Sequence, residues 1–175
     1  MLEDKTILCY THSMQRIEII HPIPPFYRPD SEILILGSFP SVKSREQKFF
    51  YGHPQNRFWK VLAEVYSDSL PDSISDKRAF LERHCIALWD CIGKCSVEGS
   101  ADSSIRDVVP NDLSVVLNNA SIRAIYCNGK TSYNCYSRYI AKTIERDAVV
   151  LPSTSPANAA YPLDRLTEAW RIIRC

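Results

Sequence analysis

The chain has 175 residues, 45% of them apolar and 23% charged, and its formal net charge is +1. These values are typical of one globular domain with a real core, and they exclude a disordered or low-complexity chain. No apolar run approaches the roughly 20 residues that cross a bilayer, and the first residues lack the pattern of a secretion signal. We therefore expect a cytoplasmic protein with no membrane partner.

The seven cysteines and four histidines form no familiar metal-binding pattern. The cysteines include no Cys-x-x-Cys pair, and the histidines lack the His-x-x-x-His spacing found on zinc-binding helices. In a chain without a secretion signal, cysteines are expected to stay reduced. The sequence therefore predicts no structural zinc site.

In chain order, an N-terminal arm (1–18) precedes a single domain (19–175), which starts with the Pro-rich, extended segment HPIPPFYRP (21–29). Continuous apolar runs then alternate with segments of helical periodicity. The runs predict strands at 32–36, 85–90, 122–127 and 148–151, and the periodic segments predict helices at 57–66, 76–84, 111–119, 130–143 and 163–173. Ser75 is the expected N-cap of the second of these helices.

This alternation predicts an α/β protein, a three-layer α/β/α sandwich with a short four-stranded parallel sheet. In such sheets ligands bind beyond the carboxyl ends of the strands. The segments that directly follow the four predicted strands are all turn-like and polar: GSFPS (37–41), WDC (89–91), NGK (128–130) and PSTSP (152–156). We therefore expect a binding cavity at this edge of the sheet.

Two phosphate- or nucleophile-presenting motifs are ruled out by their spacing. Gly129-Lys130-Thr131 resembles the end of a P-loop, but Ala124 stands where the first glycine is needed. Gly37-Ser38 lacks the flanking glycines of a nucleophile elbow. Between residues 43 and 60, by contrast, basic side chains alternate with aromatic ones. This mixture suits a ligand that carries phosphates and bases, although a solvated loop before an amphipathic helix has the same pattern.

Five motifs together resemble the uracil-DNA glycosylase superfamily, and most closely its branch of hypoxanthine-DNA glycosylases, also called DNA-deoxyinosine glycosylases. The motifs are GSFPS, YGHPQNRFWKVL (51–62), IALWDCIGKCSVEGSADSSI (86–105), IYCNGKTSY (125–133) and LPSTSPANA (151–159), and the resemblance extends over residues 19–173. It implies a three-layer fold and an enzyme that flips a deaminated base out of DNA. The enzyme then cuts the N-glycosidic bond with water and uses no cofactor.

The resemblance also implies a base pocket. Tyr51 matches the aromatic residue on which the flipped base stacks, and Asp90 matches a residue that reads the base edge. Trp89 and Asn128 are expected beside it, although a strand Trp also suits a core, and Asp90 and Asn128 also suit turns. The remaining pocket residues match the first motif: Gly37, Ser38, Phe39 and Pro40.

Asn56 matches a pocket asparagine and is the predicted catalytic residue. Many relatives carry Asp or Asn at the position of Phe39 to orient the attacking water, and a phenyl ring cannot do so. Asn56 or a backbone carbonyl could hold that water by hydrogen bonding. Alternatively, the rate enhancement comes from stabilising an oxocarbenium-like sugar and the departing base.

DNA contacts are expected from hydroxyl and basic side chains around the pocket and from a wedge that enters the helix. The expected contacts are Ser41, Lys43, His53, Lys130, Ser153, Thr154 and Ser155, and the wedge is Pro156, Ala157 and Asn158. His53 fits a purely structural turn equally well. We thus predict a monomeric, monofunctional deoxyinosine glycosylase of base excision repair, nucleoid-associated in a prokaryote. A uracil-directed glycosylase and a non-catalytic reader of damaged DNA are the alternatives.

Overall fold

The computed structural model describes residues 17–97 and 105–174. A four-stranded parallel sheet with the strand order β3-β2-β6-β7 forms its centre. Its strands are β2 (Ile33–Gly37), β3 (Ile86–Asp90), β6 (Ala124–Asn128) and β7 (Val149–Leu151). Every residue of β2 and β3 is buried. Strands covered on both faces lose the alternation of polar and apolar residues, which explains their continuous apolar runs.

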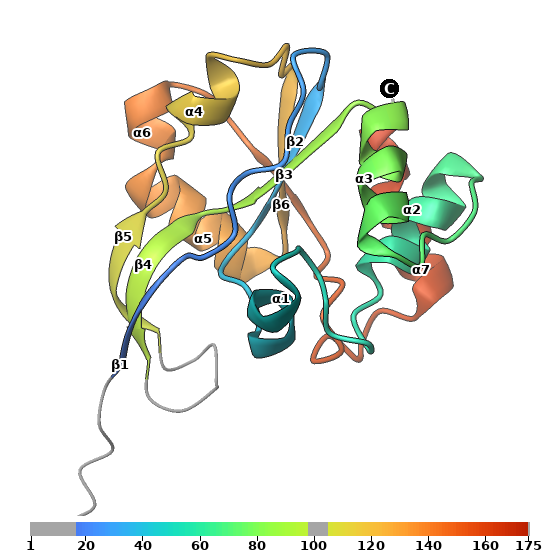
Figure 1. Cartoon of the computed structure of the whole chain (residues 1–175), viewed down its shortest axis with the longest axis horizontal. Coiled ribbons are helices and arrows are strands. Elements are labelled where there is room, and N and C mark those ends of the chain that lie inside the picture. Colours follow the sequence, from blue (N-terminus) through green and yellow to red (C-terminus); the bar gives the residue numbers. More distant parts are fainter. Residues whose placement is uncertain (1–16, 98–104, 175) are drawn as a thin grey trace, which may run out of the picture.

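Helices pack on both faces of this sheet (Figure 1). One face carries α2 (Phe58–Tyr66), α3 (Ile74–Arg83) and α7 (Leu163–Trp170), which continues into a 3₁₀ turn (Arg171–Ile173). The other carries α4 (Ser114–Leu117), α5 (Lys130–Tyr139) and α6 (Ala141–Ile144). The predicted three-layer α/β/α sandwich with a short four-stranded parallel sheet is confirmed.

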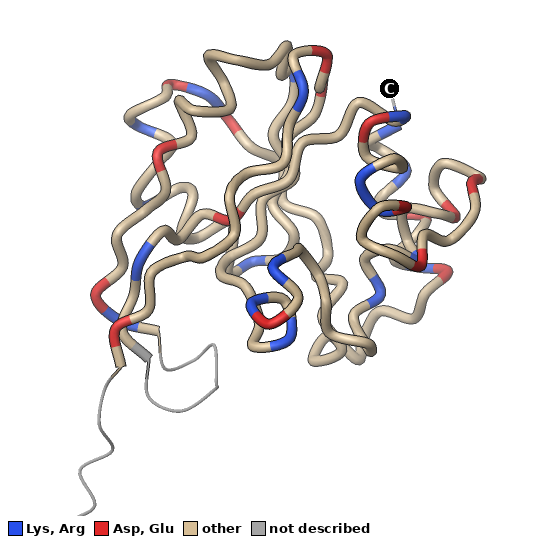
Figure 2. Tube along the Cα trace, in the orientation of Figure 1, with Lys and Arg blue, Asp and Glu red and all other residues tan. Residues whose placement is uncertain are grey.

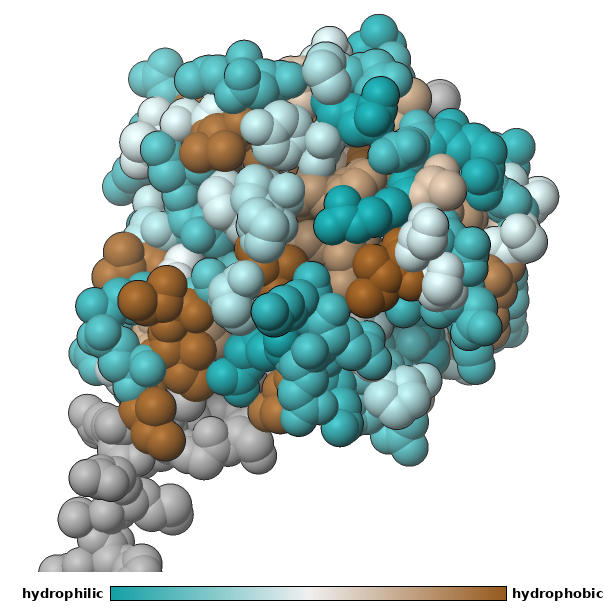
Figure 3. Space-filling model, in the orientation of Figure 1, coloured by the Kyte–Doolittle hydropathy of each residue, from teal (hydrophilic) through white to brown (hydrophobic). Residues whose placement is uncertain are grey.

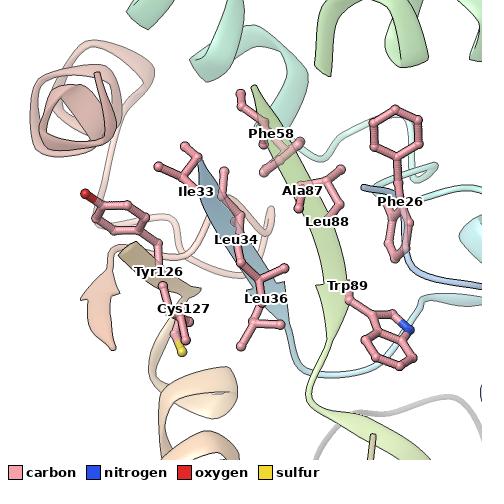
Figure 4. Close-up of a cluster of buried hydrophobic side chains, with 14 of the residues drawn as sticks. Phe26, Ile33, Leu34, Leu36, Phe58, Ala87, Leu88, Trp89, Tyr126 and Cys127 are labelled. Carbon is pink, nitrogen blue, oxygen red and sulfur yellow. The ribbon is translucent and has the colours of Figure 1, made fainter. Parts of the chain in front are cut away.

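The core lies between the sheet and these helices (Figure 4). Leu34, Leu36 and Leu88 are fully buried there. Trp89 is buried as well, and it is packed into this core beside Phe26. Because a side chain on β3 points to one face of the sheet or the other, the core position of Trp89 removes it from the cavity described below.

A second sheet, absent from the predicted elements, joins the N-terminal segment to the domain. It is antiparallel, has the order β1-β4-β5, and consists of β1 (Ile17–Ile20), β4 (Ile92–Val97) and β5 (Arg106–Pro110). Figure 3 shows apolar side chains gathered at the lower left, over this sheet. Its exposed large apolar residues are Ile17, Ile20 and Val109. Residues 1–16 of the predicted arm lie outside the described part, whereas residues 17 and 18 belong to β1.

Four helical segments differ from the prediction, and the helix expected at 111–119 is confined to α4. Ser73, not Ser75, caps α3, because its hydroxyl accepts from the Asp76 N–H while the Asp76 carboxylate accepts from the Ser73 N–H. The helix predicted at 130–143 is broken at Ile140, between α5 and α6. A short helix, α1 (Val42–Gln47), follows β2 and was not predicted.

The segments that follow β2 and β7 run to the same edge of the molecule, at the bottom of Figure 1. Figure 2 shows that α1, at this edge, carries Lys and Arg on both sides of a single acidic residue. Within the described ranges, no helix has the length and apolar character needed to cross a membrane. The fold thus places the polar strand ends and a basic helix together.

Candidate active site

A cavity of about 770 Å³ opens at the carboxyl ends of the parallel strands. Its walls come from the end of β3, from the ends of β2, β6 and β7 with the segments that follow them, and from the loop before α2. The lining residues are Gly37, Ser38, Phe39, Pro40, Ser41, Ser44, Phe50, Tyr51, His53, Asn56, Asp90, Asn128, Lys130, Thr131, Ser153, Ser155, Pro156, Ala157, Asn158 and Tyr161. Aromatic, hydroxyl, amide and charged side chains therefore converge in one space, as ligand sites require.

Gly37 and Asp90 are paired residues at the ends of β2 and β3. A Cβ atom at position 37 would lie 2.1 Å from Asp90 Oδ1, so a side chain there would displace the carboxylate. The other carboxylate oxygen, Oδ2, lies 2.8 Å from His21 Nε2, and both side chains are buried. Asp90 is therefore a buried acid that is held in place on two sides.

Tyr51 has a left-handed backbone, with φ 53°, and its ring stacks on Phe58 at a centroid distance of 3.7 Å. Its hydroxyl is buried near the Asn128 side chain, and it makes no hydrogen bond of good geometry to the residues that the structure describes. Burial, and next to it the negative charge of Asp90, raise the pKa of this phenol well above its usual value. Tyr51 is thus a neutral hydroxyl without a well-formed hydrogen bond within the described residues.

A directed chain of hydrogen bonds runs from Asn128 through Thr154 to Asn56. The Thr154 N–H donates to Asn128 Oδ1 at 3.0 Å, which fixes the Asn128 amide so that its Nδ2 donates to Thr154 Oγ1 at 2.9 Å. The Thr154 hydroxyl must then donate onward, to Asn56 Oδ1 at 2.9 Å. The Phe58 N–H donates to the same oxygen at 3.0 Å.

The orientation of the Asn56 amide follows from this chain. Its oxygen already accepts two hydrogen bonds, from Thr154 and from the Phe58 backbone. Its Nδ2 donates to no residue within the described ranges, and Asn56 lines the cavity. Asn56 therefore turns N–H donors, and not its carbonyl oxygen, toward a ligand.

Arg57 holds the loop after β7 (152–161). Its guanidinium donates to the carbonyl oxygens of Ser155, Asn158 and Tyr161, and its backbone N–H donates to the carbonyl of Thr154. Arg57 is one of the basic residues of segment 43–60, whose pattern suits either a phosphate ligand or a solvated loop before a helix. Its donors are occupied by the loop, because a planar fork of N–H groups fits several carbonyls at once.

The family model described as "Uracil DNA glycosylase superfamily" matches residues 24–174. The chain belongs to the uracil DNA glycosylase superfamily. The recognition made from the five motifs is therefore confirmed, and the cavity lies where those motifs meet.

Relatives within this superfamily include two curated proteins named "Hypoxanthine DNA glycosylase". The one from Methanosarcina acetivorans is 33% identical over 152 residues, which is 86% of this chain and 94% of the relative. The one from Methanosarcina barkeri is 32% identical over 137 residues, or 77% of this chain and 85% of the relative. A solution NMR structure of a candidate uracil DNA glycosylase from M. acetivorans has a TM-score of 0.74 and 29% identity, and covers 90% of this chain and 100% of its own.

Most residues that the superfamily motifs singled out do line the cavity, and three do not. Trp89 belongs to the core. Lys43 lies on α1 outside the cavity, exposed and paired with Glu46 at 2.8 Å. Thr154 is fully buried, and its hydroxyl is used by Asn56 and Asn128, so the expected contact of this side chain with DNA is wrong.

Sequence reasoning missed His21, Ser44, Tyr161 and the clamping role of Arg57. The Ser44 hydroxyl accepts from the Gly52 N–H at 3.0 Å and so ties α1 to the Tyr51 turn. Ser41, expected to contact DNA, lines the cavity but also caps α1. No spacing rule connects residue 21 with residue 90, and the Pro-rich context of His21 was its only signal.

No group of three His, Cys, Asp or Glu side chains that could hold a metal occurs among the described residues.

Proposed function

We propose that this protein is a DNA glycosylase that takes hypoxanthine from DNA and hydrolyses its N-glycosidic bond. Membership of the superfamily and two relatives named hypoxanthine DNA glycosylase support this proposal. So does a cavity large enough to enclose a flipped base, whose walls offer donors, acceptors and aromatic faces.

The reaction breaks the bond between the sugar C1′ and the base nitrogen. The bonding electrons leave with the base, the sugar becomes oxocarbenium-like, and water adds its oxygen to C1′. One proton of that water is lost, and the base takes up one proton, so that an abasic site and free hypoxanthine result. Water adding to such a cation needs little help from a strong base. The site must above all stabilise the charges that separate.

The orientation of Asn56 is the observation that carries this assignment. Its amide N–H groups can donate to the departing base, where negative charge develops, or hold the oxygen of the attacking water. Its oxygen cannot take a proton from that water, because Thr154 and Phe58 already occupy it. Asn56 therefore acts as a donor that is fixed in place before the substrate arrives.

The absence of a polar group at Phe39 fits this chemistry. Phe39 lines the cavity, and its ring meets the His21 ring edge-on, with centroids 5.7 Å apart. It forms an apolar wall, which excludes water and strengthens the electrostatic effect of the donors. The stacking of the base on Tyr51, and the reading of its edge by Asp90 and Asn128, belong to this proposal.

The rim of the cavity carries the groups proposed to hold DNA. His53, Lys130, Ser153 and Ser155 line it and can reach phosphates. Pro156, Ala157 and Asn158 form the tip of the loop that Arg57 holds, and we assign them the wedge that fills the gap left by the flipped nucleotide. We place Lys43, on the exposed surface of α1, at the margin of this contact.

The test is a pair of substitutions at position 56. Asn56→Asp keeps an acceptor for Thr154 and Phe58 but replaces the N–H donors by a charged carboxylate oxygen, whereas Asn56→Ala removes both the acceptor and the donors. An oligonucleotide duplex with one deoxyinosine is treated with protein and then with alkali, under single-turnover conditions. We expect both variants to lose about 100-fold or more in rate, as removal of one stabilising donor does.

Asn56→Asp should unfold at the same urea concentration as the wild type, because its packing and its two accepted hydrogen bonds remain. Full activity of Asn56→Asp would contradict the proposed role of the Asn56 N–H groups as donors. Parallel duplexes with deoxyuridine or with undamaged bases define the substrate. Faster cutting at uracil than at inosine would overturn the proposed base, and tight binding without alkali-labile product would overturn the hydrolysis.

A further inference from the structure

We propose that His21 is a positioning residue. It holds Asp90 so that the carboxylate can only accept a hydrogen bond from the base, and in this way it protects adenine from excision. The inference rests on the function proposed above, and it concerns a side chain that lies behind the cavity wall. His21 is not among the residues that line the cavity, whereas Asp90 is.

The protonation of His21 is fixed by its two partners. The backbone N–H of Ile23 donates to His21 Nδ1 at 3.2 Å, so this nitrogen carries no proton. The proton of the neutral ring is therefore on Nε2, which lies 2.8 Å from Asp90 Oδ2 and donates to it. A neutral imidazole therefore supplies the donor of this hydrogen bond, and Asp90 Oδ2 is its acceptor.

The rest of the site prevents the carboxylate from turning. Asp90 Oδ1 is seated against Gly37, where a Cβ would approach it to 2.1 Å. The Asn111 amide donates to the Asp90 backbone carbonyl at 2.9 Å. Phe39 packs edge-on against the His21 ring. With Oδ2 occupied by His21, Oδ1 is the acceptor left for a ligand, and it receives no hydrogen bond from the described residues.

A carboxylate oxygen of Asp90 that can only accept hydrogen bonds discriminates hypoxanthine from adenine. Hypoxanthine presents an N1–H donor on its pairing edge, which Asp90 can accept. Adenine presents a bare N1 acceptor, which would face the carboxylate as one lone pair against another. Leaving buried polar groups unpaired discriminates between such analogues more strongly than shape does. His21 sustains this discrimination by holding the carboxylate in the acceptor arrangement without touching the base.

The test compares His21→Phe, which keeps a ring but has no donor, with His21→Gln, whose amide nitrogen can take the place of Nε2. Single-turnover rates are measured on duplexes with one deoxyinosine and on matched duplexes with deoxyadenosine at that position. We expect His21→Phe to lower the inosine rate and the inosine-to-adenine ratio by about tenfold or more, and His21→Gln to restore most of both.

His84→Phe is the matched control, because His84 also donates to an aspartate, Asp68, at 2.8 Å, but away from the cavity. His84→Phe should alter the stability of the protein and leave its inosine-to-adenine rate ratio unchanged. In the wild type, nitrogen-15 NMR should show His21 as the neutral ring with its proton on Nε2. A proton on Nδ1, or a folded His21→Phe protein with an unchanged ratio, would overturn the role of His21.

A second readout keeps this result separate from the proposed function. Free hypoxanthine and free adenine are titrated into wild type and His21→Phe, and binding is followed by NMR. Equal preference for hypoxanthine in both proteins contradicts the role of His21, whether or not the wild type cuts DNA. Failure of the wild type to cut any of the duplexes contradicts the proposed function, and a preference that His21→Phe loses would still support the positioning role.

Discussion

Tyr51 combines two energetically unfavourable properties with a stacked ring. A left-handed backbone is unfavourable for a residue with a side chain. Its ring faces Phe58, and its hydroxyl is buried without a partner in the part of the chain that the structure describes. Such an unpaired group costs about 1–3 kcal/mol, and in a native protein it calls for a functional reason. We propose that this hydroxyl, which lies close to Gly37, donates to a base that enters the cavity lined by Tyr51.

Tyr51→Phe tests this reason. Removal of the unpaired hydroxyl should leave the free energy of unfolding unchanged or raise it by about 1 kcal/mol, while the rate on inosine-containing DNA falls. Urea unfolding and single-turnover kinetics measure the two effects. Tyr136→Phe is the matched control, because the Tyr136 hydroxyl donates to the Arg146 carbonyl at 2.7 Å and its loss should destabilise the fold. A destabilised Tyr51→Phe protein with full activity would contradict this interpretation.

At the residue scale, the positions of Asn56, Asp90 and Asn128 around one cavity could be predicted, while their orientations could not. Strand ends and motif order place these residues, because parallel strands end at one edge of the sheet. The direction of the Asn56 amide depends on Thr154, which is 98 residues away. His21 likewise lies 69 residues from Asp90. No local pattern contains such information.

At the scale of elements, the start of α2 and the loop after β7 form one unit. Asn56 and Arg57 are neighbours at the start of α2, and both bind that loop. Asn56 accepts from Thr154, and Arg57 donates to carbonyls on either side of the wedge. The donor that we propose for the base and the loop that we propose for the duplex are therefore held by two adjacent residues.

Arg57→Lys should loosen this unit, since an ammonium cannot span the carbonyls that a guanidinium fork reaches. We expect faster amide hydrogen exchange over the loop, a loss of about 2 kcal/mol in stability and at least tenfold weaker activity. Exchange measured by mass spectrometry locates the change. Arg83→Lys, which replaces a guanidinium bound to Asp68 far from the loop, should leave exchange in the loop at the wild-type rate. If the amides of the loop exchanged at the same rate in Arg57→Lys as in the wild type, the proposed role of Arg57 in holding the loop would be contradicted.

The central strands and long helices could be predicted, because burial on both faces or on one face gives each a distinct periodicity. The second sheet could not. β1 and β5 are largely exposed, so they have neither continuous apolar runs nor clean alternation. Helix α1 has only 6 residues, too few for a periodic pattern. At α3, two serines compete for the cap, and the Asp76 carboxylate decides in favour of Ser73.

At the scale of the whole molecule, stability is linked to pH through a carboxylate outside the site. Hydrogen bonds from His84, and then from Arg83, hold the pKa of Asp68 well below its usual value. A depressed pKa stabilises the folded state above the unfolded value of about 4, and this contribution is lost as the pH falls further.

Asp68→Asn should therefore be less stable than the wild type at neutral pH, and the difference should shrink as the pH falls from about 4 toward 2. Urea unfolding of both proteins across this range measures it. Asp147→Asn, at an exposed carboxylate with no ion pair to the described residues, provides the comparison. If the difference in free energy of unfolding between the wild type and Asp68→Asn stayed constant down to the lowest pH, the link between Asp68 ionisation and stability would be refuted.

The bonds that define the site close very long chain loops. Asn56 and Thr154 are 98 residues apart, and His21 and Asp90 are 69 residues apart. Contacts of high sequence separation form late in folding, because the entropy of loop closure must be overcome first. A chain still emerging from the ribosome, without residues 152–161, lacks the Thr154 hydroxyl that orients the Asn56 amide. The arrangement that we propose for base excision therefore forms only after the loop that follows β7 has been synthesised.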